Sequence, residues 1–249
     1  VFMFIIFGSF LLRSGAGDFI VRLAQCLAGR FTGGAGLVAV VGSGLMGSVS
    51  GSAVANTVST GVITIPMMKQ SGFPGRFSAG VVAAASTGGA LMPPVMGAGA
   101  FVLASYTQIS YLTIIAASAL PAVLYFLTVS YFVRIEARRL GLIPTRTTDS
   151  ESVSDVLKEG WHFIIPMVVL VGFLVGGRTP TTAAAFAILS VIGASWISSK
   201  PMKPMDIFEA VVDGVKTMVS TALLLVAVGI IINVVTTTGV GNAFSLMIV

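Results

Sequence analysis

Charged residues are scarce in this sequence. They make up 9% of its 249 residues, whereas ordinary soluble domains carry about 25%. Hydrophobic residues make up 55%, and the mean hydropathy is +1.01. A soluble fold of this length could not cover its surface with so few polar groups, so the composition excludes a soluble enzyme and a disordered tail. The basic residues are scattered rather than clustered, which excludes a nucleic-acid-binding module.

Cysteine, histidine and acids inside apolar segments are also lacking. Cys26 is the only cysteine, which excludes a disulfide framework and a cysteine-rich metal site. His162 is the only histidine, and no acid occurs between Asp18 and Glu136. The sequence thus offers no dyad for an intramembrane enzyme, and we expect no catalytic residue. No signal peptide is visible and both ends fall inside apolar patterns, which predicts a piece of a longer integral membrane protein.

Two long segments, residues 31–68 and 77–133, contain no charge. Each is too long for a single span of about 20 residues. With the apolar periodicity of the remaining chain they predict an all-α integral membrane fold. The expected elements are a truncated span at 1–12, an interfacial amphipathic helix at 18–30, a re-entrant hairpin at 34–68, a broken helix at 77–105, a span at 110–133, a linker at 141–158, spans at 161–177 and 181–198, and a long helix at 205–237.

Segment 34–68 decides the topology. As one helix it would be roughly 52 Å long at 1.5 Å per residue, too long for a hydrocarbon core of about 30 Å. Glycine and serine, which weaken helices, are concentrated at Gly47–Ser52. We therefore predict two shorter helices joined by a tip at these residues. Such a re-entrant hairpin has both of its ends on one side of the membrane.

The distribution of Lys and Arg favours this hairpin. With 34–68 re-entrant, all of the 14 Lys and Arg residues except Arg178 fall on one side. Treating the segment as a full span would instead scatter them over both sides. By the positive-inside rule, the basic side is cytoplasmic.

A short repeat indicates an inverted architecture. Ser14–Phe19 and Thr238–Ala243 are similar, and each follows an apolar span. The predicted topology puts the first copy at the cytoplasmic face and the second at the outer face, and inverted repeats with broken helices are typical of secondary transporters. The predicted organisation is a first inverted repeat at 1–140, a cytoplasmic linker at 141–158, two connecting spans at 159–200 and the truncated start of a second repeat at 201–249.

Two motifs have competing interpretations. Gly42–Gly47 matches G-x-G-x-x-G, but the acid that a dinucleotide site needs about 20 residues further on is absent, so close helix packing explains these glycines better. The hydroxyl-rich tip that follows is either an ion or substrate site, which we favour, or a packing interface. A serine-protease interpretation fails because Val49 replaces the serine of G-x-S-x-G.

A second break is expected at Ser86–Gly97, where paired glycines and paired prolines would unwind the span. A proline kink without a ligand is the alternative. Because no acid lies in a predicted span, we expect sodium held by neutral oxygens rather than a proton. The candidate ion- and substrate-binding residues are Ser48, Ser50, Gly51, Ser52, Asn56, Thr87, Gly88, Gly89, Pro93 and Pro94, with Ser50, Ser52, Asn56 and Gly88 as the sodium ligands.

Three runs, Gly47–Asn56, Ile65–Met68 and Gly88–Ala98, carry a family resemblance. They resemble the large membrane subunit of TRAP transporters, and are most similar to the fused-permease type that pairs with TAXI binding proteins. The resemblance covers essentially the whole chain, with the start of the protein and the second hairpin expected to be missing. It implies sodium-driven uptake of a small organic anion across the bacterial inner membrane, by a mobile domain that moves elevator-fashion against a scaffold.

The resemblance also implies partners. These are a periplasmic substrate-binding protein of the TAXI type, the organic anion, the lipid bilayer and a small membrane subunit fused in the full-length chain, with no nucleic acid and no cofactor beyond Na⁺ as the coupling ion. By similarity, the hairpin tip and the broken helix form one sodium site and part of the substrate site. An alternative of a different class is an ion or solute channel that uses the hairpin as a pore loop and needs no binding protein.

Overall fold

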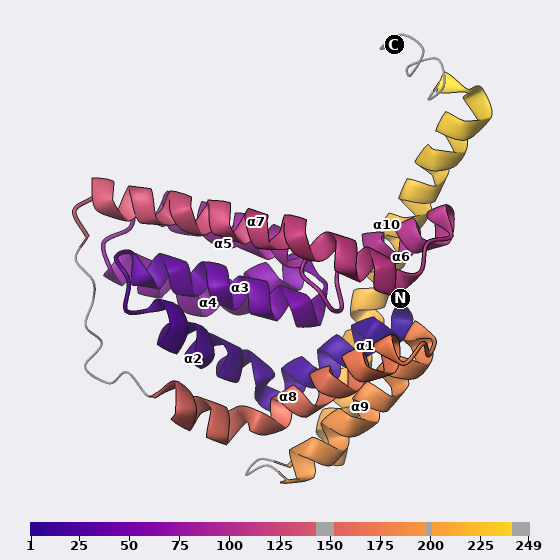
Figure 1. Ribbon diagram of the computed structural model, residues 1–249, viewed down its shortest axis with the longest axis horizontal. Coiled ribbons are helices and arrows are strands. Elements are labelled where there is room, and N and C mark those ends of the chain that lie inside the picture. The colour runs from indigo at the N-terminus through magenta and orange to yellow at the C-terminus, as the bar shows by residue number, and fades with distance from the viewer. Residues whose placement is uncertain (143–151, 198–200, 241–249) are drawn as a thin grey trace.

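The computed structural model describes residues 1–142, 152–197 and 201–240, in which helices are joined by short turns and no strand occurs (Figure 1). The predicted all-α fold is therefore confirmed for this part of the chain. Within these described residues, four helical stretches are long and apolar enough to cross a membrane. They are Phe2–Ala28, which contains α1 (Phe2–Leu11) and α2 (Gly17–Ala28), then α7 (Tyr111–Arg139), α8 (Val153–Val175) and α10 (Pro204–Thr238).

The chain bends between α1 and α2 at a π-helical turn, Leu12–Ala16. Gly15 in this turn has a φ of 98°, a conformation that residues with a Cβ rarely adopt. Beyond the bend, α2 packs against α3 (Gly34–Ser50) and α8, and it buries Val21, Ala24 and Ala28. Protein therefore covers one face of the helix that was expected to lie in the membrane interface.

Helices α3 and α4 (Ala53–Gln70) form an antiparallel hairpin. Gly51 makes the turn with a φ of 61°, and the Ser52 hydroxyl caps α4 by accepting a hydrogen bond from the Ala55 N–H at 3.3 Å. The turn is shorter than the tip predicted at Gly47–Ser52. The reason is that main-chain bonds, such as Gly51 N–H to the Gly47 carbonyl at 3.0 Å, keep α3 helical as far as Ser50.

The open end of the hairpin meets the start of α5 (Gly75–Gly89) and the end of α7 at the left of Figure 1. A Cβ added to Gly33 would lie 2.7 Å from the Ala137 Cβ, so these helix ends are in direct contact. Basic residues of these helix ends, among them Lys69, Arg76 and Arg138, therefore gather at one end of the bundle. The two hairpin ends share this end, as a re-entrant hairpin requires.

The second break lies where glycines and prolines predict it. Helix α5 ends at Gly89, residues 90–97 are not helical, and α6 (Ala98–Thr107) follows. Helix α7 then runs back along α5 and the hairpin. Its first residue, Tyr111, donates a hydrogen bond to the Val95 carbonyl at 2.5 Å and so ties the unwound segment to α7.

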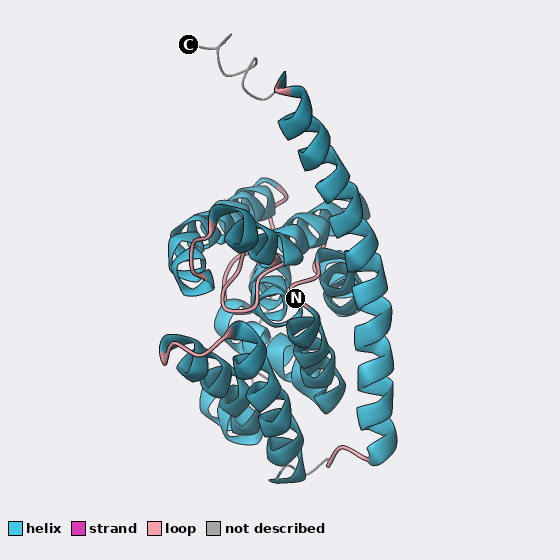
Figure 2. Cartoon of the chain, turned by 90° about the vertical axis from the view of Figure 1, so that its right-hand side faces the viewer, coloured by secondary structure: helices cyan, strands magenta, loops and turns pink. Residues whose placement is uncertain are grey.

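Helices α8 and α9 (Pro180–Ile197) pack side by side. Helix α8 begins at Val153, so the last residues of the predicted linker 141–158 are helical. Helix α10 packs against α1 and continues beyond the other helices (Figure 2). An ion pair between Arg13 and Glu209 joins the π-helical turn that follows α1 to α10.

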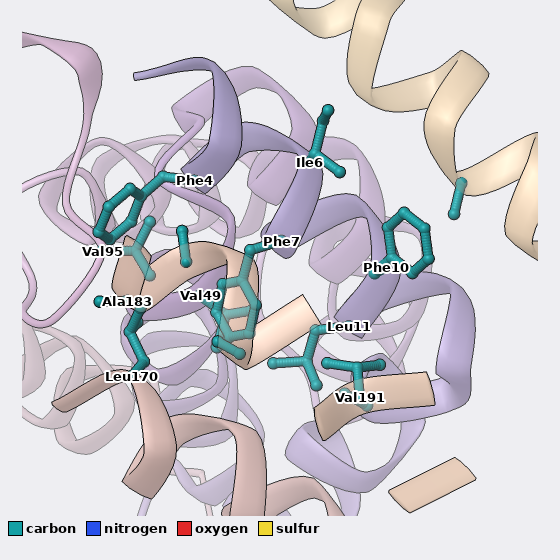
Figure 3. Close-up of a cluster of buried hydrophobic side chains, with 14 of the residues drawn as sticks. Phe4, Ile6, Phe7, Phe10, Leu11, Val49, Val95, Leu170, Ala183 and Val191 are labelled. Carbon is teal, nitrogen blue, oxygen red and sulfur yellow. The ribbon is translucent and has the colours of Figure 1, made fainter. Parts of the chain in front are cut away.

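Two hydrophobic clusters hold the helices together. One lies among α2, α3, α5 and α7 and contains Val38, Val82 and Val133. The other gathers α1, α8 and α9 around the hairpin tip and the unwound segment, and Figure 3 shows its residues Phe7 and Val49. Helix α1 therefore packs against the hairpin tip on one face and against α9 and α10 on others.

Candidate ion and substrate site

The hairpin tip rests directly on the unwound segment of the broken helix. The Val95 N–H donates a hydrogen bond to the Ser48 carbonyl oxygen at 3.2 Å. A Cβ added to Gly51 would lie 2.2 Å from the Met96 carbonyl oxygen, and one added to Gly97 would lie 3.2 Å from the Gly51 oxygen. Glycine is therefore needed at Gly51 for close approach as well as for its φ. The two breaks predicted from the sequence are in contact.

Next to the tip, α3 and α5 cross almost backbone to backbone. A Cβ added to Gly47 would lie 2.2 Å from the Gly89 Cα. A Cβ added to Gly89 would lie 2.8 Å from Asn56 Nδ2 and 3.0 Å from the Ser43 carbonyl oxygen. These distances are too short for any side chain, so the two glycines set the spacing between the hairpin and α5 and bring α5 against Asn56.

Fully buried polar side chains occur along α3, α4 and α5, which pack against one another. We call them the polar seam; each is 0% exposed, and they are Ser43, Asn56, Thr60, Thr64, Ser78 and Ser86. Asn56 Nδ2 donates to the Ser43 carbonyl oxygen at 2.8 Å, and the Ser43 and Thr60 hydroxyls are hydrogen-bonded at 3.1 Å. Asn56 and Thr60 therefore join the two arms of the hairpin through Ser43.

Two oxygens of the polar seam, Asn56 Oδ1 and Ser86 Oγ, have no hydrogen-bond partner among the described residues. Leaving a buried polar atom unpaired costs about 1–3 kcal/mol, so such atoms usually face a ligand, an ion or a water. The orientation of the amide follows from its neighbour, because the Ser43 carbonyl can only accept and the Asn56 NH₂ group must face it. The amide oxygen is thereby directed elsewhere, where a cation or a water would satisfy it.

The polar seam offers a cation only neutral oxygens, because its members are serine, threonine and asparagine. The described part of the chain contains no group of three His, Cys, Asp or Glu side chains that could hold a metal. Hydroxyl, amide and main-chain carbonyl oxygens replace the hydration shell of alkali cations in membrane proteins. The chemistry of the polar seam and the tip fits that role.

The serines of the tip are arranged around the turn. Ser48 donates to the Leu45 carbonyl at 2.7 Å and so remains tied to α3. Ser50 Oγ lies 3.5 Å from the Ser52 N–H, and Ser52 Oγ caps α4. The cap uses one acceptor position of the Ser52 hydroxyl, and a hydroxyl has two. Both Ser50 and Ser52 are partly exposed at the turn.

The end of α5 distributes three predicted residues over three directions, because successive helix residues point about 100° apart. Gly89 faces the hairpin. Gly88 lies under the ring of Tyr125, whose Cε1 would be 2.2 Å from an added Cβ. Thr87 is exposed, and its hydroxyl donates to the Ala83 carbonyl at 2.8 Å. Of these three residues, the structure thus brings only Gly89 to the polar seam. Thr87 points outward, and the Cα of Gly88 faces Tyr125.

The two predicted prolines lie in the unwound segment and are partly buried. The Pro94 carbonyl accepts a hydrogen bond from the Tyr111 hydroxyl at 3.2 Å. Phe101 stacks on the Tyr111 ring at a centroid distance of 4.5 Å, and Phe4 of α1 packs against both rings. Pro93 and Pro94 therefore belong to the wall that the tip contacts, held from outside by aromatic side chains.

The sequence analysis missed three members of the polar seam near the predicted site, Ser43, Thr60 and Ser86. A signal for them was present on α4, where Asn56, Thr60 and Thr64 recur every four residues and so share one face of a helix. Ser86 gave no such signal, because its burial depends on how α5 packs against the hairpin.

Comparison with known proteins agrees with this architecture. The sequence model of the family described as "Tripartite ATP-independent periplasmic transporter, DctM component" matches residues 1–249. The C4-dicarboxylate TRAP transporter large permease protein DctM of Pseudomonas aeruginosa is 32% identical over 186 residues, which is 74% of this chain and 43% of that protein.

Two further relatives extend the alignment. The 2,3-diketo-L-gulonate TRAP transporter large permease protein YiaN of Escherichia coli is 28% identical over 225 residues, 90% of this chain and 52% of that protein. The sialic acid TRAP transporter large permease protein SiaM of Vibrio cholerae is 26% identical over 229 residues, again 90% and 52%. The chain thus spans about half the length of the relatives it matches.

These matches bear on three of the predictions. The family is a transporter component and not an enzyme family, as the sequence predicts. The match to a transporter permease family, together with four helical stretches of the described residues that are able to span a bilayer, also confirms the predicted multi-pass location in the bacterial inner membrane. Since the family model matches the whole chain, this protein belongs to the DctM family, the large permease component of tripartite ATP-independent periplasmic (TRAP) transporters.

Proposed function

We propose that the chain is part of a permease that takes up a small organic anion with sodium, after a periplasmic binding protein has delivered the anion. One observation carries the proposal: Asn56 Oδ1 and Ser86 Oγ, both buried and unpartnered among the described residues, lie on helices that cross where the hairpin meets the broken helix. The names of the three relatives support the substrate class, since C4-dicarboxylates, diketogulonate and sialic acid all carry a carboxylate.

In this proposal the sodium ion, a transported species rather than a resident cofactor, is held by neutral oxygens. Asn56 contributes its amide oxygen, Ser50 and Ser52 contribute hydroxyls, and main-chain carbonyls near Gly51 and at Gly88–Gly89 complete the shell. Ser86 joins this set because its hydroxyl is buried and unpartnered among the described residues. Pro93 and Pro94 form the wall on the substrate side. Ser48 and Thr87 remain proposed binding residues at the edge of the site.

The wider architecture is also part of the proposal. The hairpin is re-entrant and the basic end of the bundle is cytoplasmic. Residues 1–140 form the first inverted repeat and 201–249 the truncated start of the second, with the linker 141–158 and the spans at 159–200 between them. In the second copy of the repeated motif, Thr238–Ala243, residues 241–243 lie outside the described residues. The TAXI-type binding protein and a fused small subunit rest on the sequence resemblance.

The test is uptake by the full-length protein in proteoliposomes, with its binding protein, under a sodium gradient or a pH gradient. We expect the sodium gradient to drive uptake, and replacement of both Ser50 and Ser52 with alanine to raise the sodium concentration for half-maximal uptake at least fivefold. The variant Ser52→Gly removes the hydroxyl ligand, yet glycine at a helix N-cap costs only about a few tenths of a kcal/mol, so this variant separates capping from ion binding. Unchanged sodium dependence in the double variant would remove both serines from the ion site.

Omitting the binding protein in the same assay distinguishes a carrier from a channel. The carrier requires the binding protein and saturates with substrate. A channel that uses the hairpin as a pore loop would conduct without it. Flux that persists without the binding protein and does not saturate would overturn the proposal.

Elevator movement predicts that the hairpin tip leaves α1 during transport. A Cβ at Gly8 would lie 3.0 Å from the Val49 carbonyl oxygen and 3.3 Å from the Ser50 Cα. Cysteines at positions 8 and 50 are therefore within disulfide range, which is about 4.4–6.8 Å between Cα atoms. In a cysteine-free background, oxidation of Gly8→Cys/Ser50→Cys should reduce uptake at least tenfold and a reductant should restore it. Comparing the oxidised and reduced forms of one variant cancels the effect of losing the serine. Full uptake by the oxidised form would show that the tip and α1 do not separate.

A further inference from the structure

A groove on the exposed face of α8, which no residue of the polar seam lines, has a basic residue at one end. Its volume is about 340 Å³, and it is lined by Val169, Gly172, Phe173, Gly176 and Arg178. The groove is open at Gly172, because a Cβ added to this glycine would meet nothing within 4 Å. Its wall is firm, because Phe173 stacks on Phe186 of α9 at a centroid distance of 4.7 Å.

Arg178 is fixed at the end of this groove. Helix α8 ends at Val175, Gly177 in the turn that follows has a φ of 74°, and the Arg178 N–H donates to the Phe173 carbonyl at 3.1 Å. The side chain of Arg178 is exposed, and none of the ion pairs formed within the described residues includes it. It is also the one basic residue that the charge distribution predicts on the outer side of the membrane.

The depth of the groove follows from the aromatic residues of the same helices. Trp161 near the start of α8 and Trp196 near the end of α9 are 50% and 64% exposed, as expected for side chains at a membrane–water interface. From Trp161, helix α8 rises roughly 21 Å to its last residue, Val175, and the long Arg178 side chain beyond it extends toward the boundary of a hydrocarbon core of about 30 Å. Arg178 therefore lies at the level of the outer headgroups, and the groove runs from it into the acyl region.

We propose that this groove binds one glycerophospholipid, whose phosphate pairs with the Arg178 guanidinium and whose acyl chain lies over Gly172 and Gly176. The guanidinium fork matches phosphate oxygens in charge and geometry. The apolar lining matches a hydrocarbon chain. The site is separate from the proposed sodium and substrate site, and it gives a function to the one basic residue that departs from the positive-inside pattern.

The experiment uses the full-length transporter, delipidated in detergent, with a phosphatidylglycerol that carries a diazirine in one acyl chain. After illumination, the crosslinked peptides are identified by mass spectrometry. We expect label on the segment 169–178, and at least a fivefold lower yield there in Arg178→Gln and in Gly172→Leu. The matched control is Gly193→Leu on α9, where an added Cβ also meets nothing within 4 Å, and its yield should equal that of the unmodified protein.

Two further probes distinguish the contribution of the lipid phosphate from that of the acyl chain. A diazirine diacylglycerol, which lacks the phosphate, should label this segment at least fivefold less, and glycerol phosphate at millimolar concentration should not compete. Equal labelling by the two lipids, or full labelling of Arg178→Gln, would reduce the groove to ordinary lipid contact and overturn the proposal. Absence of label from 169–178 in the full-length protein would overturn it as well.

Discussion

Replacing Asn56 with leucine is expected to reduce sodium-dependent uptake by the full-length transporter at least tenfold. The substitution conserves side-chain size but removes the Nδ2 donor to the Ser43 carbonyl, at 2.8 Å, together with the unpartnered Oδ1. It removes one proposed oxygen ligand of the ion, and a tenfold loss of affinity corresponds to about 1.4 kcal/mol of binding free energy. Initial uptake rates measured over a range of sodium concentrations would show the loss.

The control for this prediction lies on the same helix. Thr64 is also 0% exposed, but its hydroxyl donates within α4, to the Thr60 carbonyl at 2.7 Å. Thr64→Val should therefore leave the sodium dependence near that of the unmodified protein. A second measurement, the shift in melting temperature that sodium produces in detergent, guards against a folding defect: we expect Asn56→Leu to melt cooperatively without this shift. If Asn56→Leu retained the full shift, Asn56 would have no part in binding sodium.

The hairpin and the broken helix were predictable because each depends on local chemistry and length. An uncharged stretch at 34–68 is too long for one span, and it carries its glycines and serines near the middle. Paired glycines and prolines in Gly88–Pro94 cannot continue a regular helix. Helix bounds were less accurate at the ends, where α8 begins at Val153 inside the expected linker. The polar residues of the linker did not prevent the first turns of α8 from forming.

The composition of the candidate site was only partly predictable. Asn56 and Gly89 were expected and meet at the crossing, whereas Gly88 faces Tyr125 and Thr87 is exposed. Which of three successive helix residues faces a neighbour depends on where that neighbour packs, and the sequence of one helix does not contain this information. The same holds for α1, whose close contact with the hairpin tip at Gly8 had no signal in the sequence.

Replacing Gly47 with alanine should lower the stability of the protein and its response to sodium more than a single added methyl group suggests. The new Cβ would lie 2.2 Å from the Gly89 Cα and 2.8 Å from the Gly89 carbonyl oxygen, and backbone atoms cannot rotate away as a side chain can. The hairpin must therefore move away from α5, which separates Asn56 from Gly89 and opens the polar seam. Overpacking of this kind costs about 1–3 kcal/mol. We expect a lower melting temperature and loss of the sodium-dependent shift.

Gly80→Ala on α5 is the matched change, because a Cβ at Gly80 meets nothing within 4 Å. In a helix interior, alanine is favoured over glycine by about 1 kcal/mol, so this variant should be at least as stable as the unmodified protein and keep its response to sodium. The contrast between the two variants isolates the crossing from the general effect of a methyl group on helix stability. If Gly47→Ala also kept its response to sodium, the close crossing would be unnecessary for ion binding, and the coupling site would have to lie elsewhere in the transporter.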